Sequence, residues 1–245
     1  MFGVPAMSNA SEANTDVVPD QPTVIRAFLV LDGVQKEISL EEMEAIKAES
    51  QERQQNMLAQ KQKSVLSKNQ MHAKSEPSGT FGPASLLDLS YYNESGFISN
   101  VYRWDLNRRI SPPVHNTSTT TTNSYTISYS TSQSFTSNFS FSTSGQKSAV
   151  TAGITVGAAW QNTYSVSQSV TQNIPPEKYG WMDYTPIMDN SYGILHEEVW
   201  SVVPGSAVEL VNEDHFLDLY IAKKTSTNIP DGLYTIVESS SYPTY

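Results

Sequence analysis

The feature that most constrains this chain is an alternation of apolar and polar side chains that begins at Ser124. In the first arm the apolar side chains occupy odd positions, namely Tyr125, Ile127, Tyr129, Phe135, Phe139 and Phe141. After Gly145, Gln146 and Lys147 the alternation resumes at even positions, which include Ile154, Val156, Ala158 and Trp160. A period of two residues is typical of a β-strand with one apolar face. We therefore predict one long antiparallel hairpin over about residues 124–170, with its tip near residues 144–149.

Almost no charge interrupts this predicted hairpin, since Lys147 is the single charged residue between Ile110 and Gln172. A charged side chain at the centre of a bilayer costs about 2.5–3.5 kcal/mol on insertion scales, whereas small hydroxyl side chains are tolerated. A strand crosses a bilayer with about 9–11 residues, and each arm here is nearly twice that long. One hairpin cannot close into a barrel, so a membrane-spanning barrel would require several copies of the chain.

The same pattern leaves other interpretations open. Alternating strands rich in Ser and Thr also occur in secreted adhesins and fibres, where hydroxyl groups form ladders between stacked strands. Ordinary β-sandwich domains contain such strands as well. The alternative to a pore-forming hairpin is therefore a non-lytic extracellular structural or adhesive β-protein, such as a spore, phage or fibre component.

Three segments resemble the pore-forming module of aerolysin-type toxins. Within that family they resemble the epsilon-toxin/mosquitocidal-toxin branch most. These are TTTTNSYTISYSTSQSFTSNFSFS, the small-residue centre SAVTAGITVGAAW, and NTYSVSQSVTQNIPPEKYGWMDYTP. The similarity covers about residues 110–190 and includes a Val/Ile-Pro-Pro step, here Ile174, Pro175 and Pro176. The resemblance implies a soluble monomer that binds a cell surface, oligomerises as a ring and unfolds its hairpin into a transmembrane β-barrel. The chain departs from the family pattern in a long polar helix over residues 39–66, and it is short for a large separate receptor domain.

On this hypothesis each part of the hairpin has a role. The ten apolar residues named above would face lipid, and the Ser and Thr residues between them would line the lumen. Gly145, Gln146 and Lys147 would form the tip and emerge in the far aqueous phase. Pro175 and Pro176 cannot donate to a β-ladder, so strand pairing must end there, and with Ile174 they would join the hairpin to a static sheet.

Aromatic residues gather outside the predicted hairpin, and most are expected to belong to the core. Some suit a surface that binds a glycan or lipid headgroup, because Tyr and Trp favour contacts that are half apolar and half wet. The candidates for this receptor surface are Tyr179, Trp181, Tyr184 and Tyr192. The expected partners are a target membrane, with a lipid or glycan receptor, and further copies of the chain.

The rest of the chain predicts a mainly β, elongated antiparallel protein. Residues 1–22 predict a disordered tail that lacks the features of a signal peptide. We expect the protein to act outside the cell, after release by lysis, after deposition in a crystal or spore, or through a leader that is absent from this sequence. Residues 23–75 predict a hairpin turning at Asp32-Gly33, then a polar helix that Ser39 and Glu42 open with a capping box. That helix is either a surface element or one that packs on a partner. Residues 76–245 predict a β-rich domain with turns at 204–205, 212–214 and 230–232.

Composition excludes several classes of function. The absence of Cys excludes disulfides, zinc ribbons and a thiol nucleophile, and the net charge of −10 argues against nucleic-acid binding. No apolar run is long enough for a transmembrane helix. The four His residues are scattered, and no P-loop, GxGxxG, GxSxG or HExxH motif occurs. We therefore expect no enzyme activity, no metal and no cofactor.

Overall fold

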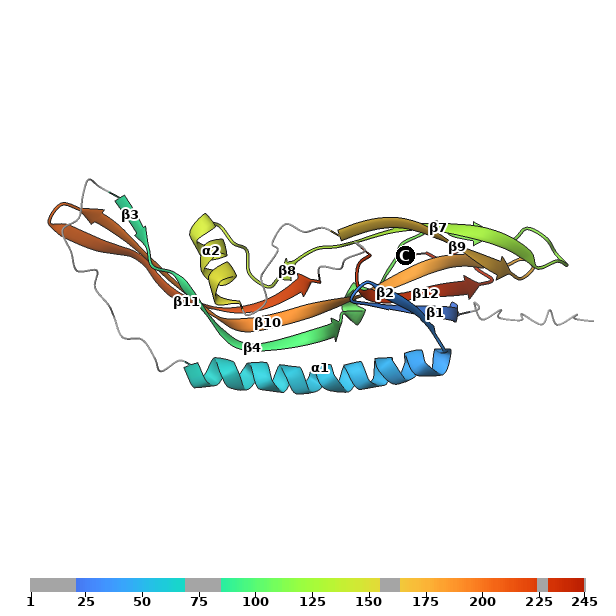
Figure 1. Ribbon diagram of the computed structural model, residues 1–245, viewed down its shortest axis with the longest axis horizontal. Helices are drawn as coiled ribbons and strands as arrows, with labels where there is room; N and C mark the ends of the chain where they lie inside the picture. The colour runs from blue at the N-terminus through green and yellow to red at the C-terminus, as the bar shows by residue number, and fades with distance from the viewer. Residues whose placement is uncertain (1–20, 69–84, 155–163, 224–228, 245) are drawn as a thin grey trace, which may run out of the picture.

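The structure, a computed structural model, describes residues 21–68, 85–154, 164–223 and 229–244 (Figure 1). It is elongated and mainly β, with a large antiparallel sheet, two helices and an N-terminal hairpin followed by the longer helix. The fold class predicted from the sequence is therefore confirmed. Neither described helix is long and apolar enough to cross a membrane.

The long axis of the molecule follows one strand, β10 (Tyr179–Val203), whose 25 residues extend over about 80 Å at about 3.3 Å per residue. Six other strands hydrogen-bond to β10 along its two edges: β3 (Ser85–Asp88), β4 (Tyr91–Tyr102), β5 (Arg108–Arg109), β6 (Val114–His115), β11 (Ser206–Ala222) and β12 (Gly232–Ser239). β1 (Thr23–Leu31) joins the sheet through β12. The strands β2 (Val34–Ile38) and β8 (Thr136–Ser137) complete this ten-stranded sheet at its borders. A 3₁₀ turn, η1 (Trp104–Leu106), follows β4.

Of the three turns predicted in the C-terminal region, the one at residues 204–205 is confirmed, the one at 212–214 is wrong, and residues 230–231 lead directly into β12. β10 turns into β11 at Pro204-Gly205, where Gly205 has a φ of 82°, and β12 begins at Gly232. No turn forms at residues 212–214. There β11 continues its pairing with β10, because Glu198 lies opposite Asn212 and His196 opposite Asp214 in an unbroken ladder.

The N-terminal hairpin forms as predicted, since β1 pairs with β2 through Asp32 and Gly33, which have φ values of 51° and 78°. Both values are left-handed, as a tight hairpin turn requires. The helix α1 (Leu40–Lys68) follows, and Ser39 Oγ accepts a hydrogen bond from the Glu42 amide at 3.0 Å. Figure 1 shows α1 along one face of the sheet, beside β4. Its buried residues are Met43, Ser50, Met57 and Lys61.

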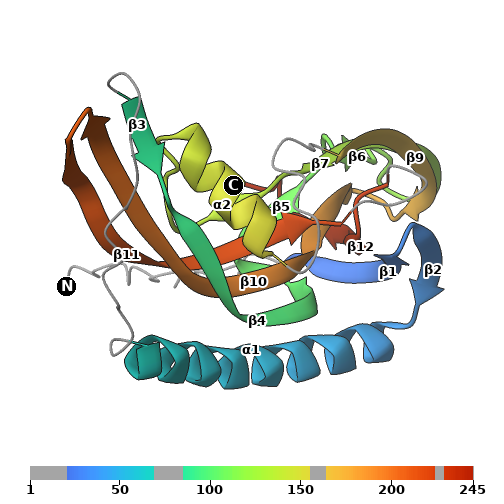
Figure 2. The ribbon, with the colours of Figure 1, turned by 60° about the vertical axis from the view of Figure 1, so that its left-hand side comes forward.

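The predicted hairpin is only partly present in this fold. Its bases, β7 (Asn123–Gln133) and β9 (Tyr164–Ile174), pair as a separate two-stranded sheet. The expected tip is instead a helix, α2 (Ser144–Gly153), on the face of the large sheet opposite α1 (Figure 2). A capping box between Thr143 and Gln146 starts this helix, and Val150 and Ile154 then reach the apolar surface of β10 and β11. The strand predicted over residues 138–142 and the hairpin tip predicted near residues 144–149 are therefore wrong in this conformation.

Candidate functional site

The β7–β9 ribbon presents one uncharged face to solvent. The strands pair without a bulge from Asn123 opposite Ile174 to Gln133 opposite Tyr164. The outward side chains are all exposed, and all are hydroxyls except one amide: Ser124, Thr126, Ser128, Ser130, Ser132, Ser165, Ser167, Ser169, Thr171 and Asn173. The alternation read from the sequence therefore corresponds to real opposite faces in these two strands.

The other face of the ribbon packs on the large sheet. Ile127 is fully buried and Tyr129 is buried, both in a core cluster with Tyr184, Tyr234 and neighbours. The Tyr129 hydroxyl donates to Gln168 Oε1 at 2.6 Å, and burial raises the pKa of the Tyr129 phenol. Tyr125 is half-buried. These three residues, expected to face lipid, thus face the protein core in this conformation.

Toward the end of β7, the side of the strand that packs on the large sheet contains buried polar atoms that lack hydrogen bonds to the described residues. Thr131 and Gln133 are both 3% exposed. Within the described part of the chain, Thr131 Oγ1 and Gln133 Oε1 have no hydrogen-bond partner, although Gln133 Nε2 donates to the Ile187 carbonyl at 2.9 Å. A buried polar group without a partner costs about 1–3 kcal/mol. The ribbon therefore docks on the sheet with less stabilisation than a fully paired surface would give.

The end of the ribbon is fixed by one buried side chain that sequence reasoning missed. Asn116 is fully buried, and its Nδ2 donates to the carbonyls of Ile174 at 2.8 Å and Pro175 at 3.0 Å. Its Oδ1 accepts from Asn123 Nδ2 at 3.0 Å. β9 ends at Ile174, as the two prolines predict, and Asn116 holds that junction. No sequence pattern distinguishes Asn116 from the other polar residues around it.

Beyond Gln133 the chain wraps onto the large sheet rather than extending the ribbon. β8 pairs with the outer edge of β11, and the Asn138 side chain accepts from the Asp218 amide at 2.7 Å. Three half-buried rings, Phe135, Phe139 and Phe141, pack with α2 on a core cluster that includes Tyr92, Leu195, Leu217 and Leu219. The apolar residues of the predicted inserting segment are thus sheltered from water here.

The residues predicted as the hairpin tip form the first turn of α2. Gln146 is buried, and its Oε1 accepts from the amides of Ser142 at 2.8 Å and Thr143 at 3.1 Å. Lys147 is exposed. Gly145 lies against β3, where a Cβ atom would collide with the Asp88 carboxylate. The Thr-x-x-Gln spacing at 143–146 is the capping-box signal in the sequence for the start of this helix. Val156, Ala158 and Trp160 lie outside the described residues.

The expected receptor surface is wrong for three of its four residues. Trp181 and Tyr184 are fully buried and Tyr192 is 5% exposed, because β10 is covered by other elements on both faces. The Tyr184 hydroxyl donates to the Asp231 carbonyl at 2.8 Å. Tyr179 is half-buried and stacks on the His115 ring at 4.1 Å. In this conformation these aromatic rings hold the core together and leave no shared surface for a ligand.

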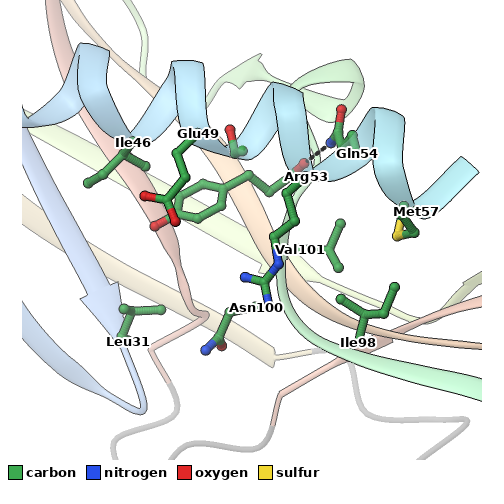
Figure 3. Close-up of a pocket in the computed structure, with 11 residues that line it drawn as sticks. Leu31, Ile46, Glu49, Arg53, Gln54, Met57, Ile98, Asn100 and Val101 are labelled. Atoms are coloured by element: carbon green, nitrogen blue, oxygen red, sulfur yellow. Dashed lines mark hydrogen bonds between the residues drawn. The ribbon is translucent and has the colours of Figure 1, made fainter.

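The helix α1 holds the opposite face of the sheet through a few contacts. Lys61 Nζ lies 2.6 Å from Asp218 Oδ1, and desolvation lowers the pKa of this buried ammonium. Nearer the start of α1, Trp104 Nε1 donates to Ser50 Oγ at 2.8 Å. Between these contacts α1 and β4 leave a cavity of about 210 Å³, into which Arg53 and Ile98 project (Figure 3). The helix therefore docks at separate points rather than along a continuous core.

The described residues contain no group of three or more His, Asp or Glu side chains placed to hold a metal ion. No protein-family model, no curated protein and no solved structure matches the chain. The functional site proposed below is therefore the β7–β9 ribbon, together with the described residues that follow β7.

Proposed function

We propose that the protein is a pore-forming toxin that binds a cell surface, oligomerises and inserts an extended form of the β7–β9 ribbon as part of a transmembrane β-barrel. In this proposal the segment between β7 and β9 leaves the large sheet and lengthens the ribbon. Before insertion, residues of this segment form β8 and α2. The protein acts extracellularly, on a target membrane that offers a lipid or glycan receptor.

The register of the ribbon is the observation that carries this proposal. Gln133 lies opposite Tyr164, and continuing that pairing one residue at a time closes the hairpin around Ser148 and Ala149. In the continued register Phe139 falls opposite Ala158 and Phe141 opposite Val156. Odd apolar positions of the first arm thus share a face with even apolar positions of the second arm. A shift of one residue would place them on opposite faces.

The length of the segment also suits a bilayer. From Ser134 to Lys147 the first arm adds 14 residues to β7, more than the about 9–11 residues that a membrane strand requires. Transfer to lipid keeps the Phe rings out of water, so much of the apolar burial lost from the sheet is regained. The unpaired polar groups of Thr131 and Gln133 lower the cost of moving the ribbon away from its core.

Oligomerisation follows from the edges of the ribbon. Of the described strands, β9 pairs with β7 alone and contains no charged residue, although Arg26 Nη1 donates to the Thr171 carbonyl at 3.4 Å. A strand that has one neighbouring strand and no charged residue of its own favours pairing with a further strand. Within a membrane every backbone group must be paired, so hairpins from several copies would have to close into a ring.

A paired-cysteine lock tests the proposal. A Cβ at Gly145 would lie 2.7 Å from Asp88 Cγ, which places the Cβ atoms of Asp88→Cys and Gly145→Cys within about 4.2 Å, in the range of a disulfide. The chain has no other Cys, so this bond has no competitor. The oxidised double variant should release no dye from liposomes or susceptible cells, and reduction should restore release. The two single variants are the controls.

Two results would oppose the proposal. One is a parent protein that never releases dye after acid, protease or receptor treatment. The other is a locked protein that releases dye as fast as its reduced form. Ordered fibres in electron micrographs, together with either result, would favour the structural or adhesive alternative, in which the exposed hydroxyl ladder stacks between copies.

A further inference from the structure

We propose that the cavity between α1 and β4 binds a free α-amino acid with an apolar side chain, of about the size of leucine. This site goes beyond the proposed function, because no residue that lines it belongs to the β7–β9 ribbon or to the segment that follows β7. Its volume of about 210 Å³ lies below the range of about 300–1,000 Å³ that is usual for pockets with drug-sized ligands. The ligand must therefore be small.

The floor of the cavity is apolar and comes from several elements. Met57 on α1 is 5% exposed, and Val101 on β4 is 4% exposed. Half-buried side chains complete the floor, namely Leu31, Ile46 and Ile98. Figure 3 shows these side chains around one space beneath α1. A short branched aliphatic chain placed there leaves water for an apolar surface, which favours its binding.

Two hydrogen-bond donors meet at one side of the cavity. Asn100 Oδ1 accepts from Lys223 Nζ at 2.7 Å, and Lys223 is itself neutralised by Asp32 and Asp231 at 2.8 and 3.2 Å. An ammonium group only donates, so the atom that Asn100 keeps for the cavity is its Nδ2 donor. The Arg53 guanidinium, which also only donates, is directed toward Asn100 (Figure 3). A ligand carboxylate can accept from both groups at once.

The backbone holds Asn100 in place for this contact. Asn100 has a φ of 56°, in the left-handed region, and lies at a bulge in the pairing of β4 with β10. Its amide donates to Asp189 Oδ1 at 3.1 Å. A bulge redirects a side chain, and left-handed residues of this kind are frequent at ligand sites. Because Asn100 is already fixed, little freedom is lost when a ligand binds.

Glu49 supplies the opposite charge, one turn before Arg53 on α1. Glu and Arg four residues apart on a helix commonly pair. Here both side chains line the cavity, and neither has an ion-pair partner among the described residues. Glu49 instead affects the Tyr102 phenol, whose pKa is raised by burial and by the Glu49 charge. A ligand between the two side chains therefore meets one negative and one positive group, which a zwitterion complements.

These contacts assign an orientation to the bound amino acid. Its carboxylate lies between Arg53 and Asn100, its ammonium group lies toward Glu49, and its side chain covers the apolar floor. A ligand held in this way contacts α1 and β4 together. Its binding therefore stabilises the docked position of α1.

Isothermal titration calorimetry of the full chain tests the site with four compounds. L-leucine should bind saturably with a Kd below about 1 mM. Isocaproate is leucine without its ammonium group, isoamylamine is leucine without its carboxylate, and glycine lacks the apolar chain. Each should bind at least about tenfold more weakly than leucine, because it loses a charged hydrogen bond or the burial of the apolar chain.

Two variants test the assigned charges. Arg53→Gln should weaken leucine binding at least about tenfold, because the carboxylate loses its charged donor. Glu49→Gln should weaken leucine binding and strengthen isocaproate binding, because the isocaproate carboxylate no longer meets a like charge. Lys63→Gln removes a positive charge from α1 outside the cavity, so it should keep the parent affinities. All three side chains are exposed, so these changes preserve the fold.

Several results would overturn the assignment. Leucine that shows no saturable binding in the millimolar range would remove the site. Isocaproate or glycine that binds as tightly as leucine would contradict the role given to Glu49 or to the apolar floor. An Arg53→Gln protein with the parent affinity for leucine would contradict the carboxylate contact. None of these measurements uses a membrane, so their outcome is independent of whether the protein releases dye.

Discussion

Asp218→Asn tests how α1 is held on the sheet. Lys61 Nζ reaches Asp218 Oδ1 at 2.6 Å and is flanked by the rings of Tyr192 and Tyr220 at 5.5 and 5.3 Å. The Lys61 side chain is only 6% exposed, whereas that of Asp218 is 23% exposed. The substitution removes the carboxylate charge but keeps an oxygen that can accept from Asn190 Nδ2, now 2.7 Å away. Lys61 is then a buried ammonium without a counter-charge.

The size of the effect follows from this partial burial. Removing one partner of a buried ion pair costs about 3–5 kcal/mol. Water reaches Asp218, and two cation–π contacts worth about 0.5–1 kcal/mol each remain. We therefore expect Asp218→Asn to lower the free energy of unfolding by about 2–3 kcal/mol. Lys61→Met keeps the apolar stem and removes the buried charge, so it should cost about 1 kcal/mol or less.

Urea unfolding of the two single variants and the double variant measures the coupling. The double variant should be more stable than Asp218→Asn alone, with a coupling energy of about 1–2 kcal/mol. Hydrogen exchange should also quicken in α1 and β8 of Asp218→Asn, because the Asp218 main chain pairs with Asn138. A loss below about 0.5 kcal/mol, or additive single effects, would refute the conclusion that this ion pair fixes α1.

Three further predictions concern stability. Asn116→Ala should lower the free energy of unfolding by about 3 kcal/mol, because the carbonyls of Ile174 and Pro175 lose a buried donor; Asn123→Ala, which leaves those bonds intact, is the comparison in urea unfolding. Ile127→Ala should cost about 2–5 kcal/mol in the same assay, whereas Ser128→Ala should change stability by less than about 0.5 kcal/mol; equal effects would contradict the assignment of faces. Burial raises the pKa of several phenols, and it raises the pKa of Tyr220 to about 12. Above the ordinary pKa of a phenol, the unfolded chain therefore releases protons that the folded protein still holds. Stability should therefore fall as pH rises above about 10, and a flat profile there would contradict this.

Local signals account for the parts of the fold that the sequence predicted well. Asp32-Gly33 specifies its turn through left-handed backbone angles that few other residue pairs adopt, and Ser39 begins α1 through its own hydroxyl. The alternation of β7 and β9 is equally local, since it depends on neighbouring positions in one strand. At these positions the contacts with the rest of the protein agree with the local signals.

The incorrect predictions concern segments whose conformation or burial is set by contacts with residues far away in the sequence. Residues 138–142 alternate like a strand and residues 144–149 follow as its expected tip, but Asn138 binds β11 and a capping box starts α2. The segment 212–214 has turn-forming residues, yet the facing strand β10 keeps it extended. Trp181, Tyr184 and Tyr192 belong to the residue types that suit a wet surface, but periodicity along β10 does not reveal that other elements cover both of its faces. Asn116 could not be selected from the sequence, because its role depends on carbonyls far along the chain.

The most direct test of the central claim is the environment of neighbouring side chains after membrane binding. The chain lacks Cys, so Ser140→Cys and Phe141→Cys can each carry one environment-sensitive fluorophore. We expect a lipid-borne quencher to reach the label at 141 and an aqueous quencher to reach the label at 140, with the same alternation at 138 and 139. Labels that respond alike at odd and even positions, or that keep the signal of the soluble protein on lytic membranes, would contradict it.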